Sequence, residues 1–142
     1  MNKYKLPVAL LLLVCHSAFS QSGRVVIQVS GVDMNKGGEL SAAFFSKGNF
    51  PKMGKQSFGD TKKVSSETMQ LVFQDVPAGE YGIAVFQDID RNKDLKKNLI
   101  GIPMEPLGFS NGARIKFGLP SFDDAKVVVE KGKTLNVTVK LR

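Results

Sequence analysis

Short stretches in which apolar and polar residues alternate dominate this sequence, and turn residues separate one stretch from the next. In residues 23–30, for example, Val25, Ile27 and Val29 would share one face of a strand. Alternation with a period of two is typical of a half-buried β-strand, whereas an amphipathic helix repeats every 3.6 residues. The chain has no sustained 3.6-residue period, so no helix longer than two turns is expected. The pattern therefore restricts the chain to an all-β fold.

Six alternating stretches are evident, and a seventh strand is expected within residues 99–117. The clearest pair is a hairpin around Pro77 and Gly79, because proline suits the second position of a β-turn and glycine the fourth. Short strands separated by turns predict an antiparallel, seven-stranded β-sandwich of prealbumin-like or immunoglobulin-like type.

Two segments between these strands have a different pattern. Residues 47–66 contain scattered glycines and lysines and are expected to form a long loop. Ser121 can cap a short helical turn while Asp124, three residues later, reaches back to the cap.

The first 20 residues have the three parts of a secretory signal peptide. Lys3 and Lys5 precede an apolar run over residues 6–14, and the small residues Ala18 and Ser20 suit a cleavage site. The apolar run is shorter than the ~20 residues that span a bilayer, so we expect no transmembrane segment in the mature chain. These features predict export to the periplasm or the cell exterior.

Removal of residues 1–20 changes the chemistry available to the mature chain, residues 21–142, which we expect to be a single β-sandwich domain. Cys15 and His16 are the only cysteine and the only histidine, and both lie in the leader. Their loss removes thiol nucleophiles, imidazole bases and the usual zinc ligands. Cleavage before Cys15 would instead yield a lipoprotein, a minor alternative because bulky Val14 precedes it.

An acidic loop follows residues 81–87, which read as a strand. Oxygen-bearing side chains occupy every second position of this loop: Asp88, Asp90, Asn92 and Asp94. Calcium loops gather their ligands in this way, but Lys93 stands where such a loop needs glycine and Leu99 where it needs glutamate. Glu105 could complete a shell if the chain folds back. The sequence therefore leaves two alternatives, a solvated loop and a calcium site.

Two patterns suggest hydrolase chemistry. Residues 108–112 match the G-x-S-x-G string of serine hydrolases, in which Ser110 would be the nucleophile, but that motif needs a histidine. Carboxylate pairs could perform glycosidase chemistry. The candidates for such pairs are Asp88, Asp90, Glu105, Asp123 and Asp124. Because the mature chain lacks an imidazole base, we predict a protein that is not an enzyme and needs no cofactor, with calcium as the alternative.

Four segments follow one another in a specific order and spacing. They are Val-Pro-Ala-Gly-Glu-Tyr at 76–81, Phe-Gln-Asp-Ile-Asp-Arg-Asn at 86–92, Gly-Ile-Pro-Met-Glu-Pro-Leu-Gly-Phe-Ser-Asn at 101–111 and Pro-Ser-Phe-Asp-Asp-Ala at 120–125. Together they resemble a family of exported bacterial proteins, domain of unknown function 2141, over nearly all of the mature chain. The resemblance implies a small exported β-sandwich, similar to prealbumin-like and carboxypeptidase-regulatory-like modules, with no established activity. The family's usual loop looks like Asp-x-Asn-x-Asn-Gly-Lys-Leu-Asp, and here Lys93 and Lys96 replace its glycine and its last aspartate.

These observations predict a non-enzymatic module that presents residues 88–111 to a ligand, an envelope polysaccharide or a partner protein. The expected ligand-binding residues are Asp88, Asp90, Asn92, Glu105, Phe109, Ser110 and Asn111. A calcium-organised module that uses Asp88, Asp90, Asn92 and Asp94 is the alternative, and a carboxylate- or Ser110-dependent hydrolase is a further one. The mature chain, without Lys3 and Lys5, has a formal net charge of +5, which suits anionic surfaces. No aromatic-interleaved basic motif indicates nucleic acid, and we expect a monomer.

Overall fold

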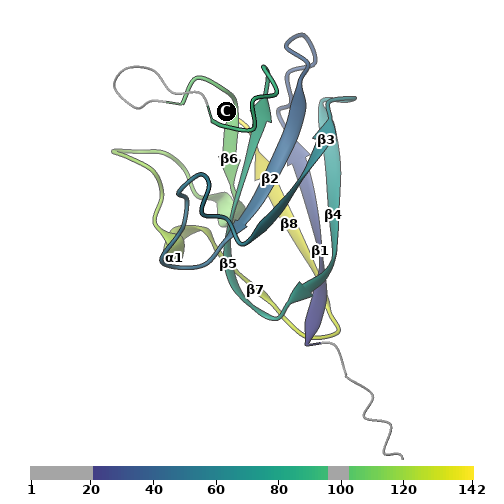
Figure 1. Cartoon of the computed structure of the whole chain (residues 1–142), viewed down its shortest axis with the longest axis vertical. Coiled ribbons are helices and arrows are strands. Elements are labelled where there is room, and N and C mark those ends of the chain that lie inside the picture. The colour runs from purple at the N-terminus through teal and green to yellow at the C-terminus, as the bar shows by residue number, and fades with distance from the viewer. Residues whose placement is uncertain (1–20, 96–102) are drawn as a thin grey trace, which may run out of the picture.

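The structure is a computed structural model that describes residues 21–95 and 103–142. These residues form eight strands in two sheets that pack face to face (Figure 1). The all-β sandwich predicted from the alternating pattern is confirmed. The predicted leader, with Cys15 and His16, and Leu99 of the acidic loop lie outside the described residues.

The smaller sheet has three strands, and the first and last strands of the chain are neighbours in it. Its strands, in order, are β4 (Thr68–Pro77), β1 (Ser22–Ser30) and β8 (Thr134–Lys140). β1 pairs antiparallel with β4 but parallel with β8. This parallel pair is the one exception to the antiparallel expectation among the described strands. Alternation is the same in either direction of pairing, so the sequence pattern does not reveal it.

The larger sheet has five strands, and other strands pair along both edges of its long strand β5 (Gly79–Asp88). β3 (Phe58–Lys63) pairs with β2 (Glu39–Phe45), which pairs with one edge of β5. The other edge of β5 pairs with β6 (Leu107–Phe109) near its end and with β7 (Lys126–Val129) near its start. All of these pairs are antiparallel. The predicted hairpin of β4 and β5 is wrong, because the two strands lie in different sheets and the bend between Pro77 and Gly79 carries the chain from one sheet to the other. Turn residues favour a change of chain direction, but they do not decide which strands pair.

The eighth strand, β3, lies within the segment that was expected to be a loop. Only Phe58 of this strand is partly buried, and the other five residues are exposed. β3 has no apolar alternation because it is an edge strand with one inward side chain. Its backbone pairing with β2 stabilises it instead. The expected seventh strand within residues 99–117 is β6.

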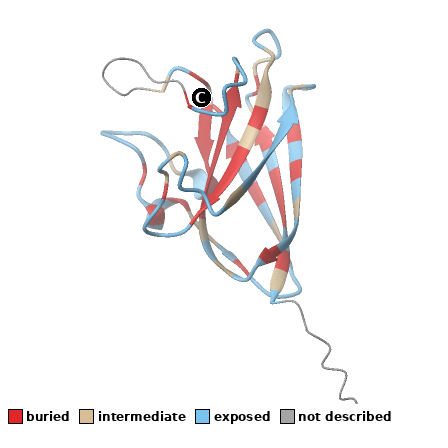
Figure 2. Cartoon of the chain, viewed as in Figure 1, coloured by how far each residue is buried: buried red, intermediate tan, exposed pale blue. Residues whose placement is uncertain are grey.

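Two hydrophobic clusters hold the domain together, one between the sheets and one outside the larger sheet. The first includes Val25, Ile27, Phe44, Val85 and Val139. The second includes Phe45, Phe50, Phe86, Phe109 and Phe122. Residues 42–45 of β2 are therefore buried on both faces, and in Figure 2 this strand changes from alternating tan and red to unbroken red. The central strands β2 and β5 therefore have no solvated face here, although the edge strand β3 is exposed.

The described helices are short and cover the second cluster. The 3-10 turn η1 (Ser110–Gly112) follows β6 directly, and α1 (Phe122–Ala125) precedes β7. Ser121 and Asp124 form the predicted capping box at the start of α1. Within residues 21–95 and 103–142, no helix has the length and apolar character needed to cross a membrane.

Candidate functional site

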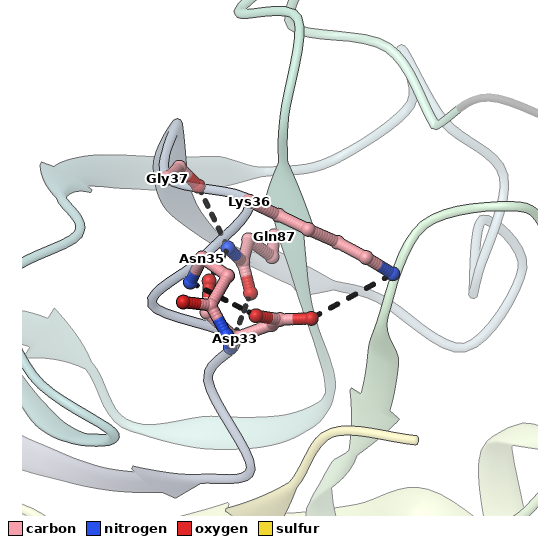
Figure 3. A network of polar contacts seen from close by, with 5 residues as sticks. All are labelled: Asp33, Asn35, Lys36, Gly37 and Gln87. Atoms are coloured by element: carbon pink, nitrogen blue, oxygen red, sulfur yellow. Dashed lines mark hydrogen bonds and ion pairs between the residues drawn. The ribbon is translucent and has the colours of Figure 1, made fainter.

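A buried glutamine fixes the chain at the point where β5 ends. Gln87 is 0% exposed, and its Nε2 donates to the carbonyl oxygens of Asp33 and Gly37 at 2.8 and 2.7 Å. Its Oε1 accepts a hydrogen bond from the Asp33 amide at 2.9 Å. The Asp33 carboxylate in turn accepts from the Asn35 amide and pairs with Lys36 (Figure 3). This network holds the β1–β2 turn against β5 beside the acidic loop.

Asp88, the last residue of β5, organises the acidic loop through backbone amides. Its carboxylate is buried and accepts from the amides of Asn92 at 3.2 Å and Lys93 at 2.7 Å. Arg91 and Lys93 have φ values of 58° and 62°, in the left-handed region that glycine adopts most readily. The loop is thus wrapped around one buried carboxylate.

Three carboxylates meet at this end of the sandwich. One oxygen each of Asp88, Asp90 and Glu105 lies within 4.8 Å of the other two. The β5–β6 register pairs Phe86 with Leu107, so its continuation brings Asp88 beside Glu105. Glu105 is 5% exposed and accepts from the Ile89 amide at 3.0 Å. Hard carboxylate oxygens in such an arrangement suit a divalent cation such as Ca²⁺.

The other members of the expected calcium set lie beside this cluster. Asn92 donates through Nδ2 to Asp90 at 3.2 Å and accepts from the Asp94 amide at 2.9 Å. Asp94 is exposed and is not a member of the carboxylate cluster. The structure thus adds Glu105, which is remote in the sequence, to Asp88 and Asp90.

The remaining predicted ligand residues lie at the other end of β6. Phe109 is 4% exposed and packs in the second cluster, while exposed Asn111 donates to the Asp124 carbonyl at 3.0 Å. Ser110 is 0% exposed, accepts from the Ile83 amide at 2.9 Å and donates to the Ala125 carbonyl. Its hydroxyl therefore connects three segments of the core.

The two groups of predicted residues are well separated. Ser110 bonds to Ile83, and the carboxylate cluster contains Asp88, five residues further along β5. At about 3.3 Å per residue, this separation is about 16 Å. Ser110 and the carboxylates therefore do not converge in one concavity.

A cleft of about 750 Å³ lies beside β6. Its walls are residues 103–109, the loop of residues 113–119 and the end of the chain after β8. The apolar lining residues are Pro103, Leu107, Phe109, Ala113, Ile115, Phe117 and Leu119. The charged ones are Glu105, Arg114, Lys116, Lys140 and Arg142.

The floor of this cleft is the junction between the two sheets. The backbone of Leu107 exchanges hydrogen bonds of 3.1 and 3.2 Å with that of Arg142. A Cβ on Gly108 would lie 2.5 Å from the Lys140 carbonyl oxygen, so only glycine permits this approach. Figure 1 shows the C-terminus lying beside β6.

The loop of residues 113–119 is the part of the site that sequence reasoning missed. Ile115, Phe117 and Leu119 are 45%, 109% and 46% exposed. No role was predicted for these three residues from the sequence. Apolar residues that alternate in the sequence but remain exposed are the signal of a binding surface, and only the structure shows that exposure.

Comparison with known proteins gives a match to a protein-family model. The family model described as "Uncharacterized protein conserved in bacteria (DUF2141)" matches residues 27–137, from within β1 to within β8. No curated protein and no solved structure matches the chain. The matched span includes the acidic loop, β6 and the loop of residues 113–119. The resemblance inferred from the sequence is confirmed, and the chain belongs to the DUF2141 family of uncharacterized proteins conserved in bacteria.

Proposed function

We propose that this protein is a non-enzymatic, exported binding module that holds a small ligand in the cleft beside β6. The observation that carries the proposal is the cleft itself, with exposed Ile115, Phe117 and Leu119 along one wall. Its volume of about 750 Å³ falls within the range of ~300–1,000 Å³ that is usual for small-molecule sites. An apolar lining with a few charged groups is the usual composition of such sites.

The arrangement of the polar residues supports binding rather than catalysis. The Ser110 hydroxyl is buried and bonded to backbone groups of β5 and α1. The carboxylate cluster lies about 16 Å from it along β5. A nucleophile and a base must lie within hydrogen-bond reach of each other, and Ser110 lies too far from the carboxylate cluster for this.

A matched pair of tryptophan variants tests the proposed cleft. The chain has no tryptophan, and a Cβ on Gly118 or on Gly48 would meet no atom within 4 Å. Gly118 lines the cleft, whereas Gly48 lies outside it. We expect an amphiphile such as dodecyl maltoside to shift the amide NMR signals of residues 103–109 and 113–119. Gly118→Trp should weaken this response and Gly48→Trp should preserve it. A panel of amphiphiles that leaves these amides unchanged would refute the proposal.

A second candidate function is a calcium-organised module, because three carboxylates approach one another so closely. Two unit charges 4.8 Å apart repel by about 1 kcal/mol in water and by roughly 3 kcal/mol at an effective dielectric constant of 20. A divalent cation among Asp88, Asp90 and Glu105 would replace this repulsion by attraction. Asn92 lies next to the cluster and could add an amide oxygen.

Thermal unfolding with and without calcium tests this second candidate. A cation that binds only the folded state stabilises it by about 2.7 kcal/mol at 100 times its Kd, so Tm should rise in calcium and fall on chelation. Glu105→Gln should abolish the rise, while Glu67→Gln, at an exposed position outside the cluster, should keep it. Equal Tm values in millimolar calcium and in chelator would eliminate the calcium function.

A further inference from the structure

We propose that the ligand of the cleft is a single-chain anionic amphiphile, a molecule with one apolar chain and one negatively charged head group. This inference rests on the proposed function, and it adds the chemical class of the ligand. It follows from two features of the lining, the exposed apolar wall and the cations around it.

The apolar wall is a strip on the loop of residues 113–119. Ile115 and Leu119 keep nearly half of their surface exposed, and Phe117 is fully exposed. All three line the cleft, so an apolar chain bound there can contact them. Buried Leu107 and Phe109 form the facing side of the cleft. An alkyl chain that enters the cleft would remove this apolar surface from water.

The charges around the cleft are predominantly positive. Arg114 and Lys116 belong to the loop wall, while Lys140 and Arg142 belong to the opposite wall. The ion pairs between described residues are Lys36–Asp33, Lys126–Glu80 and Lys133–Glu130, and none involves these four cations. Lys116 does interact electrostatically with Asp124, so it adds less to the positive potential than the other three. The acidic lining residue, Glu105, is 5% exposed and directs Oε1 to the Ile89 amide. The potential at the mouth therefore favours an anion.

The shape of the site favours a single molecule over a membrane surface. A loop that inserts into a bilayer needs only exposed apolar and basic side chains. Here a second wall and a floor at Gly108 face the loop and enclose a volume suited to a small molecule. A chain held between the walls would place its head group among the cations.

The test compares three probes that share a twelve-carbon chain, each used below its micelle concentration. They are dodecanoate, neutral dodecyl maltoside and cationic dodecyltrimethylammonium. Binding is measured by calorimetry, and its place by the amide signals of residues 103–109 and 113–119. We expect dodecanoate to bind about tenfold or more tightly than the neutral probe, with the cationic probe weakest. The preference should decrease as salt is added.

Charge variants identify the residues responsible. Lys116→Gln and Lys140→Gln should each weaken dodecanoate binding about threefold to tenfold and leave dodecyl maltoside binding unchanged. Lys55→Gln removes an exposed lysine outside the cleft and is the matched control. It should change neither affinity.

The outcomes separate this inference from the proposed function. Equal binding of all three probes in the cleft would refute the anionic ligand and keep the binding module. A probe set that leaves the cleft amides unchanged would refute both. Binding to vesicles that contain phosphatidylglycerol, without binding of monomeric dodecanoate, would overturn the inference in favour of a membrane surface.

Discussion

Replacing Gln87 by methionine tests whether the buried network of Figure 3 holds the site end of the sandwich in place. Methionine has a similar length and volume but cannot form the three hydrogen bonds of the amide. The change leaves the Asp33 amide, the Asp33 carbonyl and the Gly37 carbonyl without this partner. Gln87 is 0% exposed, so water does not replace the amide without local opening.

The magnitude follows from the number of bonds. Each buried hydrogen bond contributes about 1 kcal/mol net, and an unsatisfied buried group costs about 1–3 kcal/mol. Three bonds therefore predict a loss of about 3 kcal/mol in the free energy of unfolding. For a domain of this size the corresponding fall in Tm is roughly 10 °C or more.

Urea denaturation followed by far-UV circular dichroism measures the loss, and amide exchange of Asp33 locates it. The matched control is Gln70→Met, since Gln70 is an exposed glutamine of β4 whose side chain bonds to Gln28 at 3.4 Å. This control should change stability by no more than about 0.5 kcal/mol. A loss below about 1 kcal/mol for Gln87→Met, with the Asp33 amide still protected, would show that the network does not fix this turn.

Three further predictions concern Ser110, Gly82 and the capping box of α1. Ser110→Ala should cost about 1–3 kcal/mol in urea denaturation because it removes the partner of the buried Ile83 amide, and an unchanged stability would contradict a structural role. Gly82→Ala should cost about 1–3 kcal/mol in the same assay, since its Cβ would lie 2.4 Å from the Phe50 ring, and a neutral effect would contradict this packing. Hydrogen bonding by the Ser121 side chain and backbone lowers the pKa of Asp124 below its ordinary value of 3.8, so this stabilisation is present above about pH 4 and is lost as the pH falls through the lowered pKa. Ser121→Ala should return the carboxyl titration, measured by NMR, toward the ordinary value, and an unshifted titration curve would refute the role of the cap.

The elements that were predicted correctly depend on neighbours in the sequence. The capping box of α1 and the bend between Pro77 and Gly79 each involve residues only a few positions apart. Their dihedral angles and hydrogen bonds follow from the local residue types. The period of two fixes strand identity in the same local way.

The elements that were not predicted depend on pairing between distant segments. β3 is a strand because its backbone pairs with β2, although its side chains show no alternation. The parallel direction of the β1–β8 pair cannot be read from the residue pattern of either strand. Glu105 joins Asp88 through the register of β5 and β6.

The sequence by itself determined an all-β domain, its main turns, its capped helical turn and the family to which it belongs. The tertiary structure alone decided that Ser110 is buried, that three carboxylates meet and that Ile115 and Phe117 remain exposed beside a cleft. The physical reason is that periodicity and turn chemistry act between near neighbours, whereas burial and convergence depend on which distant segment covers each face.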